Sequence, residues 1–134
     1  MTKTMTATPP DTAVFEAATT LADSMQASAV WREFVSAQEA AKADEQFTWM
    51  LVRQNELAAM QNRAQGRGEG LDGKSLVELI ALRDRIQKHG LYLRQQEAGS
   101  AVLALLQRVN EKISEALGLD FASNAAPRRG GCCG

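Results

Sequence analysis

The chain has 134 residues and a mass of 14.5 kDa, a length that supports one domain with a modest core. Its net charge of −1 and pI of about 5.8 argue against a general nucleic-acid binder, so we predict no direct nucleic-acid binding. Hydrophobic residues make up 45% of the chain but aromatic residues only 5%, and good helix formers dominate, so the composition favours helices over sheet.

Neither membrane insertion nor secretion is predicted. No stretch approaches the roughly 18 consecutive apolar residues of a membrane-spanning helix. The first ten residues contain one charged residue, Lys3, and lack the apolar segment of a signal peptide. We therefore expect a cytoplasmic protein.

Residues 1–10 are rich in threonine and proline and predict a disordered leader before a helical domain of residues 11–121. Asp11, Ser28 and Asp44 are candidate N-caps of three successive helices, the third running to about Ala64. The first helix has apolar residues at three- and four-residue steps, namely Val14, Ala17, Ala18, Leu21 and Met25. The second and third have Val30, Phe34, Ala37 and Ala41, then Phe47, Met50, Leu51, Leu57 and Ala58.

Four glycines between Gly66 and Gly73 predict a mobile loop. A fourth helix follows, with Leu76, Leu79, Ile80, Leu82 and Ile86 as its apolar residues. We expect it to break at His89 and Gly90, with the glycine in the C′ position and the histidine near the negative end of the helix dipole.

The last helix has the clearest pattern and is predicted to end at Gly118. Its stripe is Ala98, Val102, Leu105, Val109, Ile113 and Leu117, widened by Leu103 and Leu106. Residues 122–134 predict a flexible tail that ends in two adjacent cysteines. We therefore predict an all-α antiparallel hairpin or bundle of about four to five helices, which dimerises through long amphipathic helices because one chain leaves much apolar surface uncovered.

Residues Gly68 to Ser75 match the phosphate-binding pattern G-x-x-x-x-G-K-[ST], in which Lys74 would contact a nucleotide. A true phosphate-binding loop follows a β-strand, and the predicted element before this one is a helix. Glu69 and Asp72 would also place negative charge where phosphates bind. We interpret the segment as a connection between helices, and a nucleotide hydrolase as the weakest hypothesis.

Cys132 and Cys133 are the candidate metal ligands of the chain. Adjacent cysteines are a poor bidentate pair for one zinc ion, whereas two or more chains together would supply thiolates for an iron–sulfur cluster. Arg128 and Arg129 favour the thiolate form, so a redox role is a second interpretation. An inert tail is the third.

Other polar residues predict no catalytic centre, and we expect a non-enzymatic protein. His89 is the only histidine, which excludes a multi-histidine site. The carboxylates are spread along helices without a pair that predicts a raised pKa. Trp31 and Trp49 either fill the core or anchor an interface. The basic residues of the middle third are interpreted as solvated helix faces and not as a binding patch; they are Arg53, Arg63, Arg67, Lys74, Arg83, Arg85 and Lys88.

The pattern resembles the YlbF/YmcA family of small helical bacterial regulators over about residues 12–121. The matching segments are Ala17-x-x-x-Leu21, Val30-x-x-x-Phe34-x-x-Ala37, the helix through Phe47 and Gln61, Leu79-x-x-x-Arg83-x-x-Ile86, and Glu97 through Leu105-Leu106-x-x-Val109-Asn110-x-x-Ile113 to Gly118-Leu119-Asp120-Phe121. The pattern is mostly apolar spacing.

The resemblance implies a helical protomer that dimerises, often in an intertwined way, and regulates partner proteins. Family members are associated with competence, sporulation and biofilm development, and with a complex that directs ribonuclease Y in messenger-RNA processing and carries iron–sulfur clusters on cysteines. Only Cys132 and Cys133 correspond to such ligands here.

The sequence thus supports two main hypotheses. The first is a regulatory adaptor, a homodimer or hetero-oligomer with paralogous subunits, whose tail binds a metal or a cluster shared between chains. The second is a structural helical chaperone or coiled-coil packing subunit with an inert tail.

Overall fold

The computed structural model describes residues 10–127. Over these residues the chain forms six α-helices and no strand, so the predicted all-α fold is confirmed. The helices are α1 (Pro10–Gln26), α2 (Ala29–Ala43), α3 (Glu45–Gly66), α4 (Gly73–Gln87), α5 (Gly90–Leu117) and α6 (Phe121–Ala125). None of these helices is long and apolar enough to cross a membrane.

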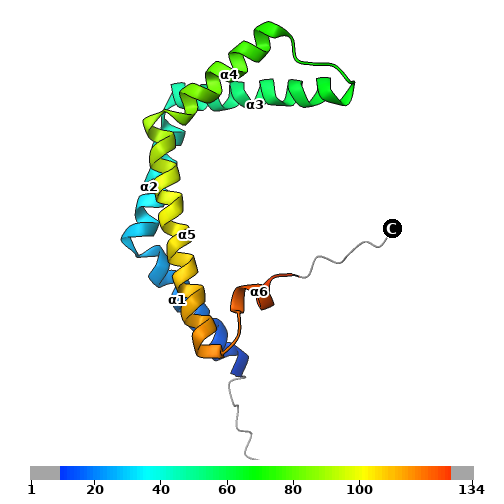
Figure 1. Ribbon diagram of the computed structural model, residues 1–134. Helices are drawn as coiled ribbons and strands as arrows, with labels where there is room; N and C mark the ends of the chain where they lie inside the picture. Colours follow the sequence, from blue (N-terminus) through cyan, green and yellow to red (C-terminus); the bar gives the residue numbers. More distant parts are fainter. Residues whose placement is uncertain (1–9, 128–134) are drawn as a thin grey trace, which may run out of the picture.

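The first five helices form one long hairpin that is bent in its middle (Figure 1). The chain runs outward through α1, α2 and α3, turns in the loop of residues 67–72, and returns through α4 and α5. α2 packs along α5, and α3 packs along α4. We call α1, α2 and α5 the arm, and α3 with α4 the finger, which projects sideways from one end of the arm.

Side-chain caps start α2 and α3 where the sequence predicts them. Ser28 Oγ accepts a hydrogen bond from the backbone N–H of Trp31 at 3.2 Å. Asp44 Oδ1 accepts one from the backbone N–H of Phe47 at 2.7 Å. Each cap satisfies an amide that has no partner inside the helix, so a single non-helical residue separates α2 from α3.

The start of α5 differs from the prediction. His89 is its N-cap, and Nδ1 accepts a hydrogen bond from the backbone N–H of Leu91 at 3.1 Å. Gly90 is therefore the first residue of α5, and its predicted role as the C′ glycine of the preceding helix is wrong. Lys88 ends α4 in a right-handed conformation, and the imidazole acceptor lets the next helix begin at once.

The end of α5 agrees with the prediction, but a sixth helix follows it. Gly118 has a φ of +69°, the left-handed conformation that glycine adopts without strain. Residues 122–125, which we expected in the flexible tail, belong to α6. Asp120 starts this helix by accepting from the backbone N–H and the hydroxyl of Ser123, at 3.3 and 2.7 Å.

The main core lies in the finger and at the bend. Its buried members come from the end of α2, from α3 and from α4, and they are Ala41, Phe47, Met50, Leu57, Leu79, Leu82 and Ile86. The Phe47 and His89 ring centroids are 4.7 Å apart, so the bend contains an aromatic contact as well as a helix cap. Most large buried side chains of the described chain therefore belong to the finger and its base.

The arm is held together by small side chains. Ala37 of α2 is buried, as are Ala98 and Val102 of α5, which allows the two helices to approach closely. Trp31 is only half-buried, and its ring centroid lies 5.8 Å from that of Phe34. Trp49, on α3, is 57% exposed, so its interpretation as a core residue is wrong.

Truncation of the finger core tests this distribution of buried residues. Leu57→Ala is expected to lower the free energy of unfolding by about 2–5 kcal/mol, because the fully buried side chain leaves a cavity. Val77→Ala, on the outside of the same finger, should change it by less than about 0.5 kcal/mol. Urea denaturation followed by circular dichroism at one protein concentration measures both, and equal losses would contradict the assignment of the core.

Candidate protein-binding surface

α5 carries two adjacent stripes of residues, one buried against α2 and one largely exposed, although Tyr92 of the second packs against the core. The inner stripe contains Ala98 and Val102, which are buried against the neighbouring helix. We call the second stripe the outer seam; it consists of Tyr92, Gln96, Gly99, Leu103, Leu106, Asn110, Ile113 and Leu117. Leu103, Leu106 and Leu117 are 61%, 43% and 57% exposed. The sequence analysis treated both stripes as one wide face. The regular spacing of the outer seam could nevertheless be seen in the sequence.

A groove runs beside the outer seam, between α2 and α5. It has a volume of about 480 Å³ and is lined by residues of both helices, among them Phe34, Tyr92, Gly99 and Leu103. Gln95 Nε2 donates to Gln38 Oε1 across the groove at 2.9 Å. The groove thus has two aromatic residues, Phe34 and Tyr92, in its walls and one polar bridge across it.

The opposite side of the α2–α5 pair carries an ion pair. The Arg94 guanidinium donates to both carboxylate oxygens of Glu33, at 2.8 and 3.2 Å, and to Ser36 Oγ at 3.1 Å. These bonds hold the pKa of Glu33 below its ordinary value. A two-pronged contact of this kind fixes the register of α5 along α2, and so the position of the outer seam.

α1 covers little of the other two helices of the arm. Val14 and Phe15 are 63% and 69% exposed. Leu21 borders a groove of about 400 Å³ whose other apolar walls are Leu105, Val109 and Ile113 of α5. A helix with its apolar residues this exposed gains little stability from its own chain, since an isolated helix of this length is marginal in water.

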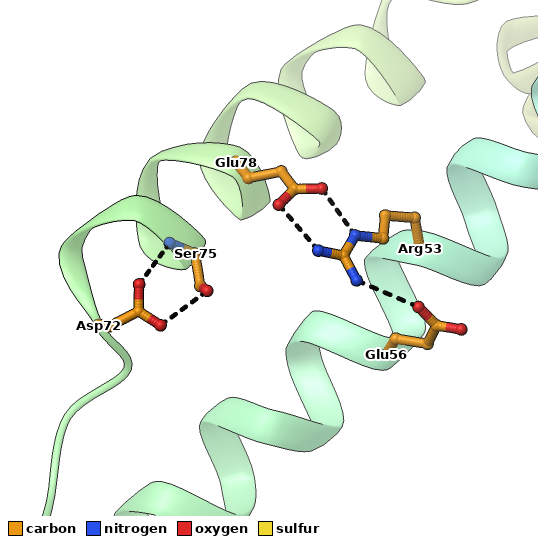
Figure 2. A network of polar contacts seen from close by, with 5 residues as sticks. All are labelled: Arg53, Glu56, Asp72, Ser75 and Glu78. Carbon is orange, nitrogen blue, oxygen red and sulfur yellow. Dashed lines mark hydrogen bonds and ion pairs between the residues drawn. The ribbon is translucent and has the colours of Figure 1, made fainter.

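Ion pairs cover one edge of the finger (Figure 2). Arg53 donates to both carboxylate oxygens of Glu78, at 2.6 and 3.0 Å, and to Glu56 at 3.3 Å. Lys88 pairs with Asp84 within α4. Three of the basic residues of the middle third, Arg53, Arg67 and Lys88, thus pair with carboxylates.

The phosphate-loop-like segment connects two helices. It follows α3 and leads into α4, so the β-strand that precedes a true phosphate-binding loop is replaced by a helix. Asp72 caps α4 by accepting from the backbone N–H and the hydroxyl of Ser75, at 2.9 and 2.8 Å (Figure 2). Those bonds lower the pKa of Asp72, so a carboxylate of the chain itself occupies the anion position at this helix start.

The predicted metal ligands Cys132 and Cys133 lie outside the described residues. Within residues 10–127, no three histidine, cysteine or acidic side chains gather as they would around a metal ion. The most extensive features of the described chain are therefore its exposed apolar helix faces, and the outer seam with its groove is the candidate site.

Loss of the ion pair in the finger should have a pH-dependent effect. The Arg53 guanidinium holds the pKa of Glu78 below its ordinary value, and the carboxylate raises the pKa of Arg53 in turn. A lowered carboxyl pKa stabilises the folded state above the unfolded value of about 4.3, and this contribution is lost as the pH falls through the folded value. Glu78→Gln is thus expected to unfold at lower temperature than the parent at pH 7, and the difference should shrink as the pH falls below the unfolded value of about 4.3.

The matched control for this prediction is Asp84→Asn in the same helix, which removes the more exposed pair with Lys88. It should shift the melting temperature little at either pH. A Glu78→Gln difference that is the same at pH 7 and pH 3.5 would show that the ion pair is not its cause.

Comparison with known proteins gives one clear result. The family model described as "Control of competence regulator ComK, YlbF/YmcA" matches residues 14–118. No significant match was found among curated proteins or among solved structures. The matched span includes α2 to α5 entirely and most of α1, so it covers both the arm and the finger. The chain therefore belongs to the YlbF/YmcA family.

Proposed function

We propose that this protein is a regulatory adaptor that acts by binding other protein chains through its helix faces. The observation that carries the proposal is the balance of apolar residues between surface and core. In the described residues, sixteen large hydrophobic side chains are exposed, whereas eleven hydrophobic residues are buried and four of those are alanines. Apolar surface of this extent, arranged in stripes, is typical of proteins that associate. The family description, which names control of a competence regulator, supports a regulatory role.

The proposal is one of binding and not of catalysis. The carboxylates whose pKa is shifted are Glu33, Asp72, Glu78 and Asp120, and hydrogen bonds lower the pKa of each. A general acid at neutral pH needs the opposite shift. These four groups serve ion pairs and helix caps, which are structural roles. The finer functions that the resemblance implies, in competence or in messenger-RNA processing, would follow from the partner that is bound.

Self-association is the first testable part of the proposal. We expect light scattering after size exclusion to give the mass of two chains at micromolar concentration, because burial of the exposed stripes favours pairing. A paralogous subunit would use the same stripes in a hetero-oligomer. A mass of one chain at every concentration tested, in the absence of any paralogue, would remove the support for homodimerisation.

The second part concerns Cys132 and Cys133, which we propose as ligands of a metal or an iron–sulfur cluster shared between chains. One chain has two cysteines, whereas such a cluster is normally held by four, so two chains together would complete the set. Glycines flank the two cysteines in the sequence, Gly131 before them and Gly134 after them.

Anaerobic purification tests the role of the cysteines. The parent protein is expected to contain iron and acid-labile sulfide with a visible absorption band, and Cys132→Ser/Cys133→Ser to contain neither. Both proteins should have the same mass and helix content if the tail is separate from the helical surfaces. Equal iron content in the two proteins, or none in either, would favour the packing-subunit hypothesis in which the tail is inert.

A further inference from the structure

His89 lies in one of the two short connections between the finger and the arm. Asp44 alone separates α2 from α3, and Lys88 with His89 separates α4 from α5. Each connection contains one side-chain cap. Asp44 accepts from the backbone N–H of Phe47 at 2.7 Å, and His89 Nδ1 accepts from that of Leu91 at 3.1 Å. The orientation of the finger on the arm therefore depends on two helix caps.

The two caps differ in their response to acid. A carboxylate accepts hydrogen bonds between about pH 5 and pH 8, whereas a histidine ring changes its charge within that range. A neutral imidazole accepts through one nitrogen and donates through the other, so the cap requires that the proton of His89 is on Nε2. Both nitrogens of an imidazolium donate, so the protonated ring cannot cap α5.

The ring of His89 is accessible to solvent and has room to turn. It is half-buried, and a cavity of about 430 Å³ lies beside it. The Phe47 ring, whose centroid is 4.7 Å away, contacts it from α3. Solvent can therefore deliver a proton to the imidazole without unfolding of the bend.

The charged residues beside the ring come from α4 and its C-cap. Those that line the cavity are Asp84, Arg85 and Lys88. Lys88 Nζ lies 2.9 Å from Asp84 Oδ1, so the one carboxylate of the cavity wall is already paired. α3 contributes only uncharged side chains to the wall. The titratable side chains that begin α5 are the neutral phenol of Tyr92 and Arg94, which pairs with Glu33. No free carboxylate of the wall thus holds an imidazolium in the capping position.

The C-terminal end of α4 offers the protonated ring another position. The last carbonyls of a helix lack partners within it and form the negative end of its dipole. His89 follows Lys88, the C-cap of α4, and its own N–H donates to the Ile86 carbonyl at 3.0 Å. An imidazolium can donate to carbonyls at this place, whereas at the start of α5 it meets the positive end of a dipole. The neutral ring thus favours α5, and the charged ring favours α4.

We propose that His89 is a pH-sensitive switch between the finger and the arm. At neutral pH the uncharged ring caps α5. When Nδ1 takes up a proton from solvent, the cap is lost, the ring turns to the C-terminal carbonyls of α4, and the first turn of α5 loosens. The Asp44 cap is unchanged, so the finger stays attached through α3 while its orientation on the arm becomes variable. The switch acts within one chain and does not depend on the self-association proposed above.

Nuclear magnetic resonance of isotope-labelled protein tests the two states of the ring. His89 is the only histidine of the chain, so its ring nitrogen signals are unambiguous. They should show the proton on Nε2 at about pH 7.5 and a second proton on Nδ1 as the pH falls toward about 5. The Leu91 amide signal should shift together with the ring, whereas the Phe47 amide, under the Asp44 cap, should not. A neutral ring protonated on Nδ1, or a Leu91 amide that does not follow the ring, would overturn the switch.

Variants with a cap that does not titrate measure the contribution of the ring to stability. Asparagine and aspartate are good N-caps, so His89→Asn keeps an acceptor at every pH, and His89→Asp is the second variant where asparagine prevents folding. Between pH 7.5 and pH 5.5 the melting temperature of the parent is expected to fall about 3–5 °C further than that of His89→Asn, the shift expected for one helix cap in a domain of this size. Equal falls in the parent and the variant would contradict the loss of the cap.

Paired spin labels test whether the cap controls the finger. Glu39→Cys on α2 and Val77→Cys on α4 place one label on the arm and one on the finger, in a Cys132→Ser/Cys133→Ser background. Dilution with unlabelled protein restricts the measurement to distances within one chain. The distance distribution is expected to broaden between pH 7.5 and pH 5.5 with His89 present, and to stay narrow in His89→Asn. A distribution that stays narrow although the ring has gained its proton would overturn the switch, because the lost cap would then leave the finger in place.

Discussion

The close packing of α2 against α5 determines where every other part of the molecule lies. Ala37, Ala98 and Val102 fill the contact, and the Arg94–Glu33 pair fixes one helix along the other. Small side chains bring the two backbones together but bury little apolar area, so this contact specifies a position more than it supplies stability. The same contact turns one stripe of α5 inward and leaves Leu103 and Leu106 of the outer seam exposed. A pair of helices in a single layer has no second layer with which to cover that stripe.

The two helices of the finger pack against each other in a different way from those of the arm. Its two helices meet through large side chains, with Phe47, Leu57 and Leu79 fully buried, and its exposed edge carries ion pairs. The finger thus has a core of its own, whereas the arm has a contact surface of small residues and α1 has almost none. Local stability is expected to follow the same order, because segments with few buried apolar contacts open most easily. The bend at His89 separates the finger, with its core of large side chains, from the arm, with its contact of small residues.

Much of this fold follows from local sequence signals. Ser28, Asp44 and Gly118 act at short range through side-chain caps and a left-handed glycine, so their roles were predictable. The role of His89 was not predictable. A histidine between two helices can place its charge at the C-terminus of the first helix or cap the N-terminus of the second. The start of α6 depends on Asn110, twelve residues before the amide it accepts from, a contact that no local pattern indicates.

The candidate site was predictable only as an excess of apolar helix surface. Periodicity tells which side chains share a face, but not which of two adjacent faces the chain will cover, since that depends on the helix that happens to lie beside it. Leu103 and Leu106 therefore looked like a widening of one stripe, and Trp49 looked like a core residue. Only the position of α2 on α5 shows which face of α5 is buried and which is exposed.

The separation of arm and finger has a consequence for how an adaptor of this shape works. Self-association through the arm, as proposed above, would leave the finger's exposed Trp49, Val77 and Ile80 outside the contact. One molecule would then have two kinds of apolar surface, one occupied by its own copy and one free for a different protein. Two-fold symmetry would present the free surface twice, once on each copy. A single polypeptide with one modest core would in this way display two kinds of binding surface.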